Sequence, residues 1–449
     1  MDLRHKFADS FNLNEPSILV PPPGPKAQQL VSREDKIASP AHGRGYPLVV
    51  DHAFGIWIMD PDGNRFMDFT SGIGVTNAGH CHPDIVEALT AQVNKFFHYC
   101  GPDFYYEQQT IASEMVVSVA PVDNAVPFFT NSGAEATEAA MKLARYYTKR
   151  PRFMALRGAF HGRTLGALSL TSSKSVQRAR YAPLIPEVTH VANPYCYRCP
   201  INLTYPACKV ACVDLVEDNF KTINPAEEVA AFFAEPIQGE GGYIVPPPEY
   251  FPKLAALLKK YDVLLAIDEV QAGNGRSGKM FAIEHWGVRP DILYTAKGLG
   301  SGFPIGVMVS RRELNTWPAG SHSNTYGGNP MGTVVVAKTL ELIQNGLMQN
   351  AAARGEELFA GLKGLQKKYD FIGDVRGMGL MRAIEIVKNF DTKERDPQRR
   401  DRIVQKCFEN GLLVYFCGPN SVRFIPPLII TKAQIAGALA VLDKVLKAV

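Results

Sequence analysis

The chain has 449 residues, of which 46% are hydrophobic and 20% are charged, and its formal net charge is +4. This length exceeds that of one ordinary domain, so we expect more than one. Acidic and basic residues are interspersed, which argues against a nucleic-acid partner, and no apolar stretch approaches the length of a membrane span. The first residues lack the apolar segment of a secretion signal, so we expect a cytoplasmic protein.

The N-terminal part of the chain changes character near residue 46. Residues 1–45 are rich in proline and weakly periodic, which predicts an arm that leads into the first domain. Two short apolar segments at 55–60 and 65–69 flank Pro61-Asp62-Gly63-Asn64, whose residue types favour a turn. We therefore expect a hairpin within residues 46–79, which we assign to the N-terminal part of the small domain that the C-terminal residues complete.

Helical patterns alternate with short apolar runs between residues 80 and 330. Such alternation predicts a large α/β domain in which helices cover both faces of a mainly parallel sheet. Residues 331–449 predict a smaller α+β domain, whose last helix begins at Thr431 because Thr431 and Gln434 have the spacing of a capping box. The apolar runs of the large domain lie at 127–130, 152–156, 231–234, 263–267, 292–295 and 306–309.

Four of the eight cysteines are clustered with the spacing Cys-x2-Cys-x8-Cys-x3-Cys. Zinc or an iron–sulfur centre would use such spacing, and disulfides would fit it equally well. A surface loop with buried thiols is the third alternative, so the metal is unknown at this stage. The clustered residues are Cys196, Cys199, Cys208 and Cys212.

Asp268 and Lys297 each follow an apolar run that predicts a buried strand. Open α/β sheets bind ligands at the carboxyl ends of their strands, so both side chains are expected at a ligand-binding edge. A carboxylate there can keep a pyridine nitrogen protonated, and a neutral lysine amine can form a Schiff base with an aldehyde. The pair therefore predicts a pyridoxal phosphate site.

Two loops would complete such a site. Ser132 and Glu135 have capping-box spacing at the start of a helix, where Gly133 would let backbone N–H groups approach a phosphate. Phe160 and Arg163 follow the next apolar run, and there an aromatic ring can stack on a pyridine while a guanidinium binds a carboxylate. Taken alone, the first loop is more often a structural helix cap, and the second is more often packing plus a solvated cation.

The order of these motifs resembles that of the class III aminotransferases, which are pyridoxal phosphate enzymes of fold type I. The resemblance covers nearly all of the chain after residue 45. It implies a large domain with a mainly parallel, seven-stranded type of sheet, a smaller α+β domain, and a homodimer with shared active sites, with further assembly of the dimers left open. The matching segments lie at 68–83, 131–136, 158–164, 235–242, 267–271, 295–298, 323–330 and 422–427.

The resemblance also implies roles for the cofactor-binding residues. Lys297 would bond to the cofactor and move the proton of the reaction, and Asp268 would pair with the pyridinium nitrogen. Phe160 would stack on the ring, and Gln271 would reach its phenolic oxygen. The phosphate would be held by Ser132, Gly133 and Ala134. Thr325 of the partner subunit would complete the phosphate site.

Substrate selection would depend on two arginines, Arg163 and Arg423. Glu240 would bridge Arg423 in one half-reaction and release it in the other. Such a pocket would take an ω-amino acid, such as 4-aminobutyrate, or an amine as amino donor, and a 2-oxo acid as acceptor. Ile73 occupies a position that is apolar in 4-aminobutyrate aminotransferases and tyrosine in ornithine aminotransferases, which disfavours ornithine.

Several alternatives remain beside this interpretation. An amino-acid racemase or epimerase of the same family would use the same catalytic residues, and an ornithine or acetylornithine aminotransferase is a further alternative. A binding module without catalysis would require loss of Lys297, Asp268 or one of the two arginines, and all are present. Residues 273–279 match glycine patterns of nucleotide-binding loops, but Met280 stands where a phosphate-binding loop needs Ser or Thr.

Overall fold

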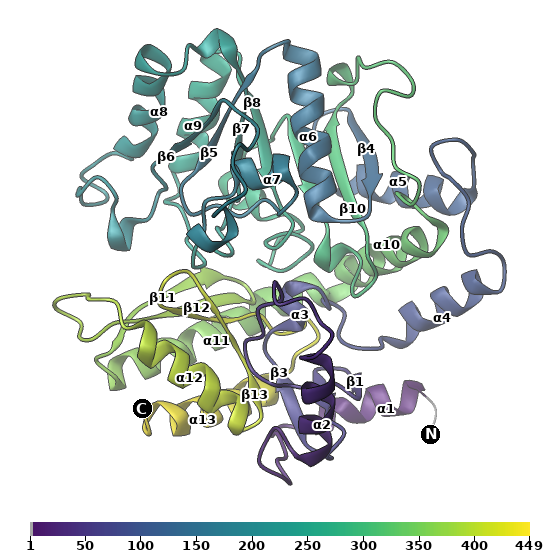
Figure 1. Cartoon of the computed structure of the whole chain (residues 1–449), viewed down its shortest axis with the longest axis vertical. Helices are drawn as coiled ribbons and strands as arrows, with labels where there is room; N and C mark the ends of the chain where they lie inside the picture. Colours follow the sequence, from purple (N-terminus) through teal and green to yellow (C-terminus); the bar gives the residue numbers. More distant parts are fainter. Residues whose placement is uncertain (1–2) are drawn as a thin grey trace. The chain divides into compact units, whose positions relative to one another are not determined.

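The computed structural model describes residues 3–449. The chain forms two compact units (Figure 1). The first unit joins the N-terminal part, through Val86, to Gln349–Val449, and the second unit is Glu87–Met348. The boundaries expected from the sequence, at residues 79 and 330, stay a prediction about which segments fold independently.

A seven-stranded sheet forms the centre of the second unit, with the strand order β4-β10-β9-β8-β7-β5-β6. Strands β6, β5, β7, β8 and β9 are parallel, and β10 is antiparallel to both of its neighbours. The prediction of a mainly parallel seven-stranded sheet is therefore confirmed. The strands are β4 (Ala125–Thr130), β5 (Arg152–Leu156), β6 (Val188–Val191), β7 (Val229–Ala234), β8 (Leu264–Asp268), β9 (Ile292–Thr295) and β10 (Gly306–Arg311).

The central strands are continuous apolar runs because helices cover both of their faces. Strands β7 and β8 are buried along their whole length. The sequence does not predict β6, since this strand contains Thr189 and His190 and only Val191 is buried. A strand at the edge of a sheet needs no continuous apolar run, so it leaves a weaker pattern.

Helix α6 (Gly133–Thr148) packs on the sheet through small side chains, among them Ala136, Ala139 and Ala140. These alanines share one core cluster with Phe153 and Phe233 of the strands. Helix α7 contacts α6, and Figure 1 shows both in front of the sheet. The remaining helices that bear on the second unit are α4 (Pro83–Val93), α5 (Glu107–Val119), α7 (Leu165–Leu170), α8 (Ala211–Thr222), α9 (Tyr250–Lys260) and α10 (Pro330–Leu342).

The first unit contains two four-stranded sheets and combines segments from both ends of the chain. In the sheet β1-β2-β3-β13, an N-terminal strand pairs in parallel with a C-terminal one. The other sheet has the order β11-β12-β15-β14. The strands are β1 (His52–Phe54), β2 (Trp57–Met59), β3 (Arg65–Asp68), β11 (Ile372–Met378), β12 (Met381–Ile386), β13 (Leu412–Leu413), β14 (Tyr415–Cys417) and β15 (Ser421–Phe424). The helices are α1 (Leu3–Asp9), α2 (Pro25–Glu34), α3 (Ser71–Gly74), α11 (Met348–Lys368), α12 (Pro397–Glu409) and α13 (Lys432–Leu446).

Two local predictions for the first unit are confirmed. Strands β2 and β3 form the expected hairpin, and the Asp60 carboxylate accepts hydrogen bonds from turn backbone N–H groups. Helix α13 begins after Thr431, which forms the capping box with Gln434. The N-terminal arm includes α1 and α2, and Ser10 anchors it by accepting a hydrogen bond at its carbonyl from the Trp57 indole. Across residues 3–449, no helix has the length and apolar character needed to cross a membrane.

Candidate active site

Asp268 and Lys297 follow neighbouring parallel strands at the same edge of the sheet. Asp268 is the last residue of β8 and lies opposite Tyr294 of β9. Lys297 follows the end of β9 and has a backbone φ of +43°, a left-handed conformation that residues other than glycine rarely adopt. Strained backbone of this kind is concentrated at functional sites. The expected position of both residues at a sheet edge agrees with the structure.

The backbone before Lys297 is held by a turn that the sequence could confuse with a nucleotide-binding loop. Residues 273–277 form buried turns and residues 278–279 a bend, rather than the start of a helix. Within them, the Asn274 side-chain amide donates hydrogen bonds to the Thr295 hydroxyl, at 2.8 Å, and to the Ala296 carbonyl oxygen, at 3.3 Å. The glycine-rich segment therefore supports the strand end that presents Lys297.

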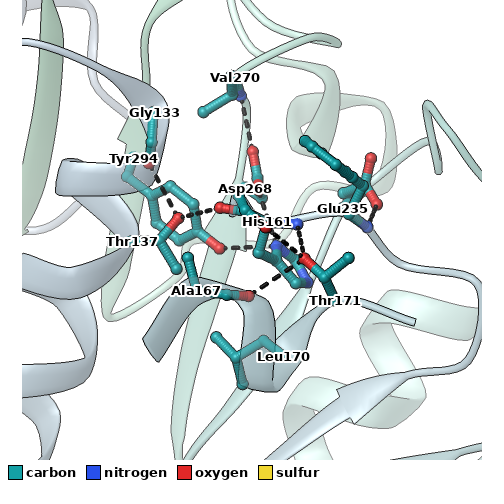
Figure 2. A network of polar contacts seen from close by, with 12 residues as sticks. Gly133, Thr137, His161, Ala167, Leu170, Thr171, Glu235, Asp268, Val270 and Tyr294 are labelled. Atoms are coloured by element: carbon teal, nitrogen blue, oxygen red, sulfur yellow. Dashed lines mark hydrogen bonds and ion pairs between the residues drawn. The ribbon is translucent and has the colours of Figure 1, made fainter. Parts of the chain in front are cut away.

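Asp268 is buried in a network of polar contacts, which Figure 2 shows. One carboxylate oxygen accepts a hydrogen bond of 2.9 Å from the Val270 N–H, and the other lies 2.7 Å from Nδ1 of His161. The Tyr294 hydroxyl is 3.0 Å from the same His161 nitrogen. Burial, followed by the negative charge of Asp268, raises the pKa of Tyr294 well above its ordinary value, so its hydroxyl stays protonated.

His161 lies inside the 158–164 motif and orients Asp268, a role that no sequence pattern indicates. Its Nε2 is buried and has no hydrogen-bond partner among residues 3–449, which assigns Nδ1 as the nitrogen that donates to Asp268. The backbone N–H of His161 donates a hydrogen bond of 2.9 Å to the Thr171 hydroxyl. The Thr137 hydroxyl lies 2.9 Å from the carbonyl oxygens of both His161 and Gly133 (Figure 2). Through Thr137, these contacts hold the backbone of His161 at the start of α6.

The start of α6 provides backbone N–H groups suited to an anion. Ser132 is the N-cap, and its hydroxyl accepts a hydrogen bond from the Glu135 N–H at 3.2 Å. The first backbone bond within the helix runs from Ala136, so the N–H groups of Gly133 and Ala134 precede it. A Cβ on Gly133 would stand 2.9 Å from both Val270 methyl groups, so glycine is required here. This loop can hold a phosphate.

The capping box expected at Ser132 and Glu135 forms only in part. Glu135 does not bond back to the Ser132 N–H. Its carboxylate instead accepts hydrogen bonds from the backbone N–H of Asn131, at 2.7 Å, and from the Asn131 side chain, at 2.9 Å. The reciprocal half of the prediction is therefore wrong, because the carboxylate reaches one residue further and braces the loop before the helix.

Phe160 and Gln271 stand beside the Asp268 network. Phe160 is half-buried, and its N–H donates a hydrogen bond of 2.9 Å to Glu235. Gln271 is 8% exposed, and its Oε1 has no hydrogen-bond partner among residues 3–449. An unsatisfied buried amide, a carboxylate aimed from a strand end and a glycine-lined anion cradle together fit pyridoxal phosphate.

The residues expected to select the substrate are divided between the two units. In the second unit, Arg163 is exposed, with its guanidinium 5.9 Å from the Phe160 ring centroid. Glu240 forms an ion pair of 3.2 Å with Lys174, a partner that the sequence did not indicate. In the first unit, Arg423 is buried in β15, with its guanidinium 5.4 Å from the Tyr415 ring centroid.

Ile73 and Thr325 occupy unusual positions in their own units. Ile73 has a φ of +70° within a left-handed turn, which is strained for a β-branched residue. Thr325 is exposed, while the neighbouring Asn324 donates a hydrogen bond to the Phe129 carbonyl oxygen at 3.1 Å. The roles expected for Ile73, Thr325 and the two arginines stay predictions.

The four clustered cysteines line one small cavity next to β6. All four are free thiols, and residues 3–449 contain no group of three or more His, Cys, Asp or Glu side chains arranged to hold a metal ion. Burial, with a smaller effect of the neighbouring thiols, raises the pKa of Cys212 to about 11. Burial also raises the pKa of the Cys196 thiol.

Comparison with known proteins gives matches along nearly the whole chain. The family model described as Aminotransferase class-III matches residues 38–446. An alanine/serine racemase of Pyrococcus horikoshii is 37% identical over 441 residues, which cover 96% of this chain and 93% of the relative. A 4-aminobutyrate aminotransferase of Mycobacterium leprae is 36% identical and covers 94% of this chain and 96% of its own length. The crystal structure of an (S)-enantioselective ω-transaminase from Thermomicrobium roseum has a TM-score of 0.87 and 32% identity, over 94% of this chain and 98% of that chain.

Proposed function

We propose that this chain, which belongs to the class III aminotransferase family, is an ω-transaminase that moves an amino group from an ω-amino acid or amine, such as 4-aminobutyrate, to a 2-oxo acid. The family depends on pyridoxal phosphate, so the cofactor expected from the sequence is confirmed. The observation that carries the proposal is the position of Asp268 and Lys297 at adjacent strand ends, beside the anion cradle of α6. We further expect a cytoplasmic location.

The proposed roles of the cofactor-binding residues follow from their contacts. Pyridoxal phosphate, when bound, withdraws electrons from the substrate carbon that carries the amino group. Asp268, oriented by His161, would hold the proton on the pyridine nitrogen. The N–H groups at the start of α6 would bind the phosphate, and Phe160 would cover one face of the ring. The unsatisfied side-chain amide of Gln271 would reach the phenolic oxygen of the ring. Lys297 would bond to the cofactor and carry the proton at the substrate carbon.

The proposed preference for ω-amino acids depends on charge. Arg163 is exposed and can bind the distal carboxylate of a substrate such as 4-aminobutyrate. Glu240 would neutralise Arg423 while that substrate is bound and would release Arg423 when a 2-oxo acid brings its own carboxylate. Within the second unit, Glu240 forms an ion pair with Lys174.

A racemase is the second candidate, because the sequence identity of this chain to a racemase is about as high as its identity to an aminotransferase. The identity to the alanine/serine racemase is 37%, against 36% to the 4-aminobutyrate aminotransferase. The two activities differ in whether Lys297 returns the proton to the substrate or to the cofactor. The same cofactor-binding residues would serve both reactions. An ornithine substrate is disfavoured by Ile73, whereas an acetylornithine substrate stays an alternative.

We also propose that the enzyme is a homodimer. The segment 97–105 and the segment around Thr325 expose aromatic side chains, including Tyr99, Tyr105 and Tyr326. The two segments meet where the rings of His98 and Tyr326 lie 4.9 Å apart. Clustered exposed aromatic surface is typical of protein interfaces. A second copy covering this surface would bury it and bring the exposed Thr325 to a neighbouring site. Sedimentation of a monomer at micromolar concentration would contradict this proposal.

A donor panel would test the reaction. The purified enzyme is incubated with 4-aminobutyrate, other ω-amino acids, simple amines and α-amino acids, each with 2-oxoglutarate or pyruvate. The amino acid formed from the acceptor and the chirality of the remaining donor are measured together, with Lys297→Ala as the control. We expect transfer from ω-amino acids that depends on Lys297. Racemisation of α-amino acids without an acceptor, in the absence of transfer, would replace the proposal with the racemase.

A further inference from the structure

Glu235 is a buried acid for which the reaction described above needs no charge. It follows directly after β7 and is 5% exposed. Its Oε1 accepts a hydrogen bond of 2.9 Å from the Phe160 N–H, and its Oε2 accepts one of 2.7 Å from the Gly239 N–H. One carboxylate thus joins the loop after β5 to the loop after β7, and these strands are neighbours in the sheet.

Both loops bear on residues that would contact the cofactor ring. The first loop carries Phe160 itself. In the second loop, a Cβ on Gly239 would stand 3.0 Å from three atoms of the Gln271 side-chain amide, so the backbone there packs directly against that amide. The two oxygens of Glu235 therefore fix the stacking residue and the backbone that confines Gln271 relative to each other.

The surroundings of Glu235 make this arrangement costly to replace. Burial, followed by the negative charge of Asp268, raises the pKa of Glu235 to about 7, while His161 and the two N–H donors oppose the rise. Figure 2 shows Glu235 beside His161 and Asp268. The two hydrogen bonds to Glu235 offset part of the free-energy cost of burying this carboxylate beside Asp268.

We propose that Glu235 is a positioning residue that holds the Phe160 and Gly239 loops in register and thereby sets the cofactor ring between Phe160 and Gln271. The inference rests on the proposed function for the presence of pyridoxal phosphate, but it concerns binding and orientation of the ring rather than the choice of substrate. Glu235 acts through backbone N–H groups and touches no reacting atom.

Three variants separate the reach of the side chain from its charge. Glu235→Gln keeps one acceptor but turns an amide NH2 toward the other backbone N–H. Glu235→Asp keeps the charge but is one methylene too short to span both donors. Glu269→Gln is the matched control, because Glu269 is fully buried near Asp268 and its Oε1 accepts from the Ile283 N–H, a bond that glutamine preserves.

The readouts are the dissociation constant of pyridoxal phosphate, the circular dichroism of the bound-cofactor absorption band and the melting temperature of the cofactor-free protein. We expect Glu235→Gln and Glu235→Asp to weaken cofactor binding about tenfold or more and to reduce the dichroism, while Glu269→Gln stays within about twofold of the wild type. If Glu235→Asp binds like the wild type, or if Glu269→Gln weakens binding as much as Glu235→Gln, the positioning role is wrong. A wild-type protein that binds the cofactor but transfers no amino group would refute the proposed function and leave these comparisons intact.

Discussion

Replacement of Asp268 by asparagine tests the centre of the proposed site. The carboxylate receives the Val270 N–H at 2.9 Å and faces Nδ1 of His161 at 2.7 Å. Asparagine can keep the bond from Val270 through its oxygen, but its NH2 then faces His161. His161 must accept that hydrogen bond and move its own proton to Nε2, which is buried without a partner among residues 3–449. A buried donor without a partner costs on the order of 1–3 kcal/mol, which sets the expected loss of stability.

The loss of catalysis should be larger than this loss of stability. A neutral amide cannot hold a proton on the pyridine nitrogen, so the barrier to removal of the substrate proton rises. A decrease of about a thousandfold or more in turnover corresponds to roughly 4 kcal/mol or more in that barrier. Single-turnover absorption of the bound cofactor measures the rate, and chemical unfolding measures stability in parallel. An Asp268→Asn enzyme with the wild-type rate would remove Asp268 from the mechanism.

Three further changes probe other parts of the site. Lys297→Ala should abolish turnover and borohydride trapping of the cofactor on the protein, yet still bind pyridoxal phosphate noncovalently; retained turnover would exclude the lysine. Glu269→Gln should flatten the dependence of stability on pH. Burial raises the pKa of Glu269 from 4.5 to about 8, so the stability that this acid contributes is present below pH 4.5 and is lost as pH rises to about 8. The loss is on the order of 5 kcal/mol in the free energy of unfolding. Parallel unfolding profiles of variant and wild type at pH 5 and pH 8 would contradict this. Arg163→Ala should slow ω-amino acids about ten- to a hundredfold and spare simple amines, whereas Glu240→Ala should shift preference toward α-amino acids by freeing Arg423; equal losses on all donors would indicate a loss of stability alone.

The sequence predicts most of the large unit because buried parallel strands leave continuous apolar runs. Six of the seven strands coincide with such runs, and the missing one, β6, is an edge strand with Thr189 and His190 in its middle. For the smaller unit, the sequence predicts segments at both chain ends but not which of their strands pair. The pairing of Met67 with Leu412, for example, joins segments that no local pattern relates.

The candidate site shows the same division between local and distant information. Lys297, Asp268 and Ser132 are found from sequence because each follows a strand pattern and carries a side chain suited to one task. His161 and Glu235 fall within the matching segments, but their roles arise from contacts between distant parts of the chain and no local pattern indicates them. His161 and Asp268, for instance, are separated by 107 positions in the chain. Such contacts exist only after the sheet has aligned its strand ends.

The residues predicted to bind the cofactor and those predicted to select the substrate fall partly in different units. The second unit contains the residues that would bind the cofactor, and their mutual contacts link Asp268, His161, Gly133 and Glu235 into one network. Ile73 and Arg423 belong to the first unit. Overall identity is almost equal to a racemase and to a 4-aminobutyrate aminotransferase, so it reflects the shared cofactor machinery. We propose that substrate selectivity depends on a few side chains, among them Ile73 and Arg423.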